Sequence, residues 1–410
     1  MTQGVAQSWL VLQMTGRAID LGILGAVTWG PVLLGGAWAG GLVDRVDRRR
    51  LLTITQIAFI VLCAAQAALI STGQLHLWMI YVFGAFTGIV TAIDSPARQV
   101  YVLELVGRDH LGSAVGLAEV VINASRIIGP SIGGLLLATV GTGECFAVNG
   151  LTYLPVLYVL IRYTSRAEPA RNPARNPARK PATDPARDPA TDPAAEPAVA
   201  GVSPAQRARL IDGLRAVRRT PAVLSCLLVA FAAGMIFNLG VALPLLTSRV
   251  FHMGGGGYGA MMAAFGIGAM PGAVAAAGST SYPSPRRIRL LTVLSGLAVL
   301  LTAASPDAAG AFIGIALTGF LSIWLIAIAN TLVQLQSEPE MRGRIMGLWT
   351  MVLPGAIPFT GMVSALVAQL AGARAGFGLA GVVLVIVGAV TWRQLGRAEQ
   401  LEQAEPLSVT

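Results

Sequence analysis

Long apolar blocks alternate with short polar turns along nearly the whole chain. Each block has about 20 residues, the length that a helix needs to cross a bilayer. The blocks lie at about 21–43, 51–70, 77–93, 112–140 and 145–163, and again at about 222–246, 258–279, 288–304, 308–331, 344–369 and 374–393. This pattern predicts an all-α membrane protein.

The segment before the first complete block is apolar but short. Residues 5–14 would form a helix of about 15 Å, which is half a bilayer. We interpret residues 1–15 as the outer part of a first span that starts upstream of Met1, so that twelve spans are expected in all. The alternative is an interfacial helix on a protein with eleven spans.

A low-complexity tract separates the two sets of spans. Proline recurs every fourth residue from Pro169 to Pro197, and each proline is followed by alanine. This composition cannot bury a core, so the tract is predicted to be a disordered linker. We therefore expect two transmembrane halves, at 1–163 and 221–395. Between them lie the linker at 164–203 and a basic amphipathic helix at 204–220, and a tail follows at 396–410.

Composition and charge agree with a membrane protein. The chain is 54% hydrophobic and 12% charged, whereas soluble proteins carry about 25% charged residues. The net charge of +9 does not indicate nucleic-acid binding, because the arginines gather beside the ends of the spans. By the positive-inside rule, the turn at 44–50 and the segment 164–220 are cytoplasmic, and the protein lies in the inner or plasma membrane.

The turn after the first complete span carries the most specific motif. It has the form G-x-L-x-D-R-x-x-R-R, with Gly40, Asp44, Arg45, Arg48 and Arg49 at the defining positions. This turn resembles the signature turn of the major facilitator superfamily, and Asp47 at the second glycine position resembles its enterobactin-exporter-like and drug-efflux branch. The resemblance implies two six-helix halves and secondary transport by alternating access.

Charged residues also follow the span at 77–93, which is the fourth when the partial first span is counted. They lie in the stretch Asp94-Ser-Pro-Ala-Arg98. The resembled branch has an acidic residue here that joins a charge cluster with the aspartate of the signature turn. We expect Asp44, Arg45, Asp94 and Arg98 to form an ion-pair network that latches the inner ends of helices in one conformation. The alternative is a set of ordinary solvated charges.

The span at 112–140 carries the strongest candidate chemistry. Glu119, Asn123 and Arg126 share one helix face, and an arginine near mid-bilayer is costly unless it faces a polar cavity or a partner. We expect these three residues, with Asn238 of the second half, to contact the substrate or a coupling ion. A structural pair between Glu119 and Arg126 remains the alternative.

The same span continues into Gly129-Pro130-Ser-Ile-Gly133-Gly134. Pro130 removes a backbone hydrogen bond and can kink the helix. The G-P-x-x-G-G pattern resembles the fifth-span motif of facilitator-family antiporters. The fourth span, however, lacks the arginine that drug–proton antiporters of the family carry there, so proton coupling stays open.

Other functional classes lack a signal in the sequence. It contains no nucleotide-binding G-x-x-x-x-G-K-[ST] loop, no cysteine or histidine spacing of a metal site, and no nucleophile–base set. We therefore expect a monomeric exporter of a small organic molecule, without enzymatic activity, metal or cofactor. The alternatives are a lysophospholipid or amphiphile transporter of the same fold, and a truncated membrane protein that transports nothing.

Overall fold

The computed structural model describes residues 2–106, 121, 125, 128–129, 132–137, 139–162, 217, 220–279, 284–337 and 342–404. The predicted linker and amphipathic helix lie outside the described residues, apart from 217 and 220.

The first half contains six described helices. These are α1 (Thr2–Thr15), α2 (Ala18–Arg45), α3 (Arg48–Ser71), α4 (Leu77–Val106), α6 (Thr142–Thr152) and α7 (Leu154–Arg162). The second half contains α9 (Pro221–Ile236), α10 (Leu239–Arg249), α11 (Gly255–Gly278), α12 (Pro285–Ala304), α13 (Ala308–Gln336), α14 (Arg342–Ala371) and α15 (Ala373–Ala404).

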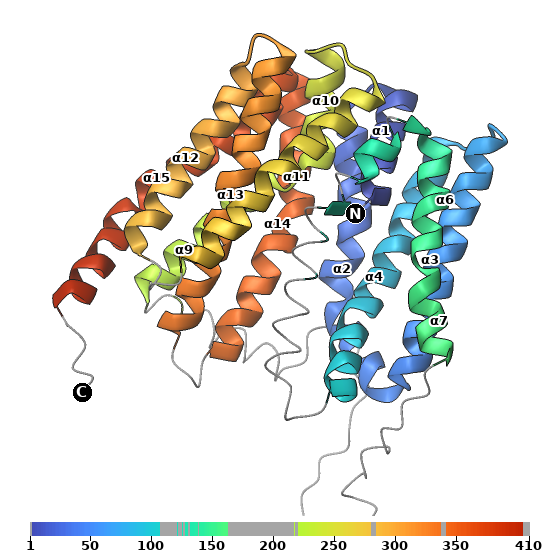
Figure 1. The fold of residues 1–410 in the computed structure, drawn as a ribbon, viewed down its shortest axis with the longest axis horizontal. Helices are drawn as coiled ribbons and strands as arrows, with labels where there is room; N and C mark the ends of the chain where they lie inside the picture. Colours follow the sequence, from blue (N-terminus) through green and yellow to red (C-terminus); the bar gives the residue numbers. More distant parts are fainter. Residues whose placement is uncertain are drawn as a thin grey trace, which may run out of the picture.

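The two halves stand side by side and meet at one end (Figure 1). Helices α1 and α2 of the first half there approach α10, α11 and α14 of the second half. The ribbons diverge toward the other end, which holds the α2–α3 turn, the end of α7 and the start of α9. We call the end with the arginine-rich α2–α3 turn the inner end and the opposite end the outer end.

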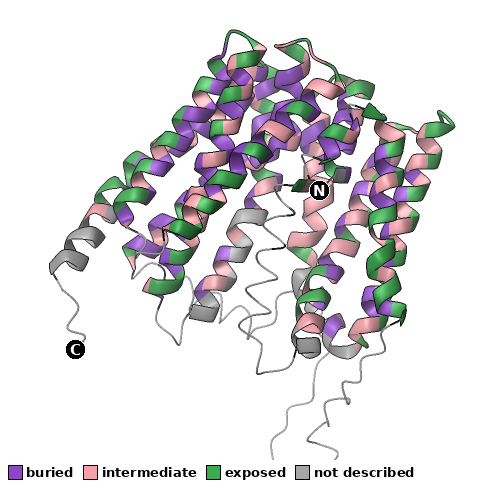
Figure 2. Ribbon diagram, in the orientation of Figure 1, coloured by how far each residue is buried: buried purple, intermediate pink, exposed green. Residues whose placement is uncertain are grey.

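The helices have the length and surface of membrane spans. Among the described residues there are eight candidate spans, and α9 with α10 forms a ninth that is bent by 40°. Helix α14 adds a shorter apolar stretch at Gly355–Ala371. Large apolar side chains such as Leu34, Val274 and Leu370 are exposed, as expected where helices face lipid. Exposed positions recur along the helices of both halves (Figure 2). The prediction of an all-α membrane protein is confirmed.

Short capped turns connect the helices at both ends of the first half. Gly16 ends α1 with a φ of 62° and donates its N–H to the Leu12 carbonyl, a left-handed cap that favours glycine. At the inner end, the Asp47 side chain accepts a hydrogen bond of 2.8 Å from the Arg50 N–H and caps α3. An aspartate at this position satisfies one of the N–H groups that a helix start leaves unpaired.

The end of α4 differs from the sequence expectation. The span was predicted to end near residue 93, but α4 continues through Pro96 to Val106. Asp94 therefore lies within the helix and is buried rather than placed in a turn. The charges that begin at Asp94 were taken to mark the end of the span, but a helix can continue past its apolar block at no cost to its backbone hydrogen bonds.

The first span of the second half is bent, which the sequence did not predict. Helix α9 ends at Ile236 and α10 begins at Leu239, with Phe237 and Asn238 at the break. Pro244 lies further along, inside α10. The break therefore has no proline of its own as a sequence signal, although prolines cause most sharp helix kinks.

Candidate transport site

The predicted substrate residues lie on the fifth span, most of which is outside the described residues. Glu119, Asn123, Arg126 and Pro130 all fall there, so their predicted roles are carried forward as proposals. Gly129, Gly133 and Gly134 are described and helical.

Gly134 meets the second half directly. A Cβ atom added to Gly134 would lie 2.2 Å from the carbonyl oxygen of Gly259 on α11, and one added to Gly259 would lie 2.0 Å from the carbonyl oxygen of Gly134. The two backbones can approach this closely because neither residue has a side chain. Gly134 was predicted as part of a helix kink, and the structure also gives it a contact between the halves.

Asn238 lies at the break between α9 and α10 and is buried. Its amide donates a hydrogen bond of 3.4 Å to the Ile357 carbonyl of α14. A Cβ atom on Gly361 would lie 2.5 Å from the Asn238 Nδ2 atom, so Gly361 makes room for this amide. Asn238 thus joins α14 to the break between α9 and α10.

Aromatic and small residues close the outer end between α1 and the second half. The rings of Trp9 on α1 and Tyr258 on α11 stack with centroids 5.9 Å apart. A Cβ atom on Gly255 would lie 2.7 Å from the Trp9 indole nitrogen, and one on Gly240 would lie 3.0 Å from the Ser8 hydroxyl oxygen. Small residues on α10 and α11 therefore let α1 pack closely.

Two polar side chains of the second half bind the turn between α1 and α2. Arg249 at the end of α10 donates a hydrogen bond to the Gly16 carbonyl. The Gln369 side chain on α14 accepts a hydrogen bond of 3.2 Å from the Ala18 N–H at the start of α2. These side chains satisfy backbone groups that helix ends otherwise leave unpaired.

Helices α2 and α14 extend this contact toward the middle of the bundle. A Cβ atom on Gly22 would lie 2.9 Å from the Ala365 side chain, and one on Gly355 would lie 3.0 Å from Leu33. We call this set of contacts between the halves the outer seam: Trp9–Tyr258, Ser8–Gly240, Gly16–Arg249, Ala18–Gln369, Gly22–Ala365, Leu33–Gly355 and Gly134–Gly259.

A polar cluster fixes α1 to the rest of the first half. The Gln7 amide donates to the Gln66 side chain of α3 at 2.8 Å, and the Asn149 amide of α6 donates to the Gln3 side chain at 3.4 Å. All four side chains are buried, as is Cys63 between them. Because α1 is joined to α3 and α6 in this way, we expect α1 to move with the first half when the seam opens.

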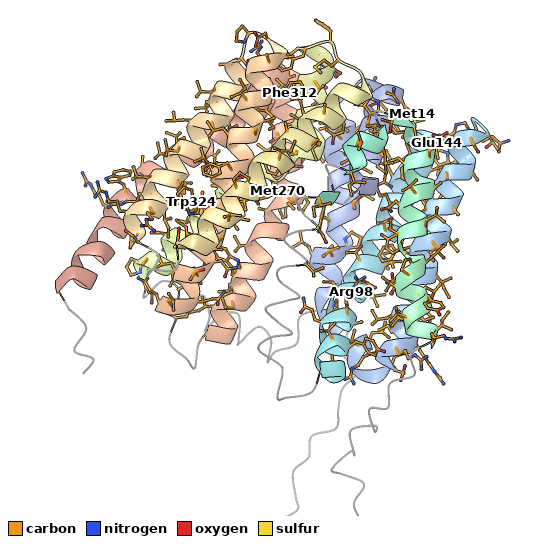
Figure 3. All side chains as sticks on the ribbon, in the orientation of Figure 1. Met14, Arg98, Glu144, Met270, Phe312 and Trp324 are labelled. Atoms are coloured by element: carbon orange, nitrogen blue, oxygen red, sulfur yellow. The ribbon has the colours of Figure 1, made fainter. Side chains whose placement is uncertain are left out.

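At the inner end, Asp94 is the centre of a hydrogen-bond network between α3 and α4. One carboxylate oxygen accepts hydrogen bonds of 2.8 Å from Thr55 and from Gln56, and the other pairs with Arg98 at 2.6 Å. The Asp94 side chain is buried, whereas the Arg98 side chain is half exposed at the inner end (Figure 3). The network joins α4 to α3 and lies where the latch was predicted.

The remaining residues of the predicted latch lie on or beside the α2–α3 turn. Gly40, Asp44 and Arg45 lie on α2, but their surroundings are outside the described part of the structure. Arg49 donates to the carbonyls of Leu160 and Ile161 at 2.6 and 2.9 Å, which joins the start of α3 to the end of α7. Arg48 lies in the first turn of α3 and is partly buried.

Several residues of the outer seam had no signal in the sequence. Arg249 and Gln369 bind backbone groups, and any residue can supply a backbone carbonyl or N–H. Gly259 and Gly240 belong to glycine-rich helices, but only the three-dimensional arrangement shows which glycine meets which partner. The nearest signal was the apolar segment containing Trp9, which its resemblance to the first span of the family placed at the outer end.

Comparison with known proteins identifies the family. Residues 3–311 match the Major Facilitator Superfamily. This match covers well over half of the 410 residues, and the chain belongs to this superfamily of membrane transporters. It is therefore a multi-pass membrane transporter and not an enzyme.

Curated relatives lie within the export branch of the superfamily. The enterobactin exporter EntS of Salmonella typhi is 28% identical over 419 residues, which cover 99% of this chain and 91% of the relative. The multidrug efflux pump Tap of Mycolicibacterium fortuitum is 26% identical, with 94% of this chain and 90% of the relative covered.

A solved structure has a similar fold. A bacterial homolog of the human lysosomal transporter Spinster, in an inward-facing and unoccupied conformation, matches with a TM-score of 0.66 and 14% identity. The match covers 100% of this chain and 96% of that structure. At this identity the likeness shows the fold alone.

Proposed function

We propose that this protein is a monomeric secondary transporter that exports a small organic molecule, of the siderophore, drug or secondary-metabolite class, by alternating access. The names of the two curated relatives support this substrate class. The fourth span lacks the arginine that the drug–proton antiporters carry, so the proposal does not include proton coupling of that type.

The observation that carries the proposal is the outer seam. Its contacts are helix-packing contacts, ring stacking and hydrogen bonds, and they join the halves at the end away from the arginine-rich turn. Such contacts can separate and form again without unfolding either half. In this proposal the conformation is inward-facing, and separation at the seam would release substrate outside.

The proposed substrate residues are Arg126, Asn123 and Glu119 on the fifth span, with Asn238 at the bend of the seventh span. Arg126 would supply the charge that recognises an anionic group or a coupling partner. In the same proposal, the charged residues of the latch hold the inner ends of the helices in one conformation and release them in the other. These residues are Asp44, Arg45, Arg48, Arg49, Asp94 and Arg98.

The test measures substrate uptake into inside-out vesicles, with a catecholate siderophore and an ethidium-type drug as separate substrates. Arg126→Ala should abolish uptake while membrane insertion stays normal, and Arg126→Lys should retain part of the activity if charge is what matters. Normal uptake by Arg126→Ala would contradict the site assignment.

A second variant addresses the latch. Asp44→Asn should slow uptake without weakening substrate binding, since it alters the change between conformations and not the site. If neither rate nor binding changes, the charges of the turn are ordinary solvated charges.

A further inference from the structure

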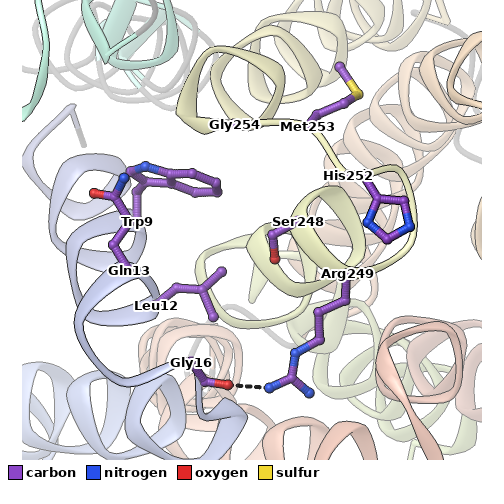
Figure 4. A pocket seen from close by; sticks show the side chains of 9 residues that line it. All are labelled: Trp9, Leu12, Gln13, Gly16, Ser248, Arg249, His252, Met253 and Gly254. Atoms are coloured by element: carbon purple, nitrogen blue, oxygen red, sulfur yellow. Dashed lines mark hydrogen bonds between the residues drawn. The ribbon is translucent and has the colours of Figure 1, made fainter.

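A pocket opens at the outer end of the seam, between α1 and the turn that joins α10 to α11 (Figure 4). Its volume is about 480 Å³, within the range of about 300–1,000 Å³ that small-molecule sites occupy. The residues used below are Trp9, Leu12 and Gly16 from the first half and Arg249, Met253 and Gly254 from the second.

One wall of this pocket is apolar and firmly held. It consists of the Trp9 indole, Leu12 and Met253. Trp9 is buried and is fixed by its stacking on Tyr258 and by its contact with Gly255. A fixed aromatic wall suits a flat apolar ligand, since little side-chain freedom is lost on binding.

The charge of the pocket comes from Arg249. None of the nine described residues that line it is acidic, so the local charge is positive. Arg249 is exposed, and its contact with the Gly16 carbonyl uses one N–H group, whereas a guanidinium has five. Its planar fork matches a carboxylate.

We propose that this outer pocket binds a small organic anion with a flat apolar body, and that the bound anion holds the outer seam closed. The pocket has walls from both halves, so it exists only while α1 and α10 are together. A ligand that binds one conformation and not the other shifts the population toward the one it binds. The effect on transport, though not the binding itself, rests on the export proposed above.

The experiment measures equilibrium binding of 2-naphthoate and of its uncharged analogue 2-naphthamide to the full-length protein in nanodiscs, with empty nanodiscs as the blank. Arg249→Gln should weaken 2-naphthoate binding about tenfold or more, as expected for loss of a charged hydrogen bond. It should weaken 2-naphthamide binding much less, because the apolar wall and the other contacts of the outer seam are intact.

Two further variants keep this test specific. Arg17→Gln removes the same charge from the same outer turn but from a residue that does not line the pocket, and it should leave both affinities unchanged. Gly254→Phe should abolish binding of both probes, because Gly254 lines the pocket and a Cβ atom there meets nothing within 4 Å, so the added ring is expected to occupy pocket space.

The same probes then test the coupling to transport. 2-Naphthoate added on the outer side should lower the maximal export rate of the wild type and not of Gly254→Phe. Binding of 2-naphthoate that is insensitive to Gly254→Phe, or an equal loss of both probes in Arg249→Gln, would overturn the anion site. A protein that binds 2-naphthoate as expected but exports nothing would instead contradict the proposed function.

Discussion

Gly134 of the fifth span and Gly259 of α11 pack backbone against backbone across the two halves. A Cβ atom on either would lie within 2.2 Å of the other residue's carbonyl oxygen. Nothing larger than glycine fits at either position without moving the halves apart, so the closure of the outer end depends on this pair.

The first prediction concerns Gly134→Val. Overpacking of this kind costs about 1–3 kcal/mol. Here the cost destabilises only the conformation in which the outer seam is closed. The variant should shift the protein toward the outward-open state and lower transport, and the outer seam should become accessible to thiol reagents at an introduced Ser8→Cys. Gly25→Val is the matched control, since a Cβ atom on Gly25 meets nothing within 4 Å. Equal behaviour of the two variants would show that the glycine contact is not required for closure.

The second prediction concerns Arg49→Ala. This change removes the hydrogen bonds to the Leu160 and Ile161 carbonyls and leaves the end of α7 without that cap. We expect a loss of about 1–3 kcal/mol in the free energy of unfolding, seen as a lower midpoint of thermal unfolding in detergent.

Arg50→Ala is the control for the Arg49 prediction. Arg50 is the next residue, has the same charge and is exposed, and its contact with Asp47 uses the backbone N–H and not the side chain. A similar loss of stability in both variants would mean that the positive charge of the turn matters and not the cap on α7.

The third prediction concerns Asp94→Asn. The buried carboxylate accepts hydrogen bonds from Thr55, Gln56 and Arg98, and an asparagine would point N–H groups at one set of these donors. The expected loss is about 2 kcal/mol. Arg98→Gln should cost less, because its side chain is 51% exposed and water can replace part of the pairing. If Arg98→Gln lowered the midpoint of thermal unfolding more than Asp94→Asn does, the main stabilising interaction of Asp94 would lie elsewhere.

The helices could be predicted well because a membrane span has one dominant requirement. A block of apolar residues must be long enough to cross the bilayer, and composition alone reveals such a block. Thus the predicted span 51–70 appears as Arg48–Ser71 and the span 288–304 as Pro285–Ala304. This requirement does not say how far a helix continues beyond its apolar block, and for that reason the continuation of α4 from Asp94 to Val106 was missed.

The contacts of the outer seam could not be predicted for a different reason. Arg249 binds the Gly16 carbonyl and Gln369 binds the Ala18 N–H, and a backbone group is present at every residue. Asp94 was expected in a charge network because the resembled branch carries an acidic residue there, but its burial was not expected. The identity of those partners, Thr55 and Gln56 on α3, depends on how the helices are rotated.

The account rests on a separation of α1 from α10 during each transport cycle, and a reversible crosslink across the outer seam tests it most directly. A Cβ atom on Gly240 would lie 4.0 Å from the Ser8 Cβ atom, a distance that suits a disulfide. The native cysteines Cys63, Cys145 and Cys226 are buried. In the double variant Ser8→Cys with Gly240→Cys, oxidation should stop export and a reductant should restore it, while each single variant transports under both conditions. Full export by the oxidised, crosslinked protein would contradict the account, because substrate would then leave without the outer seam opening.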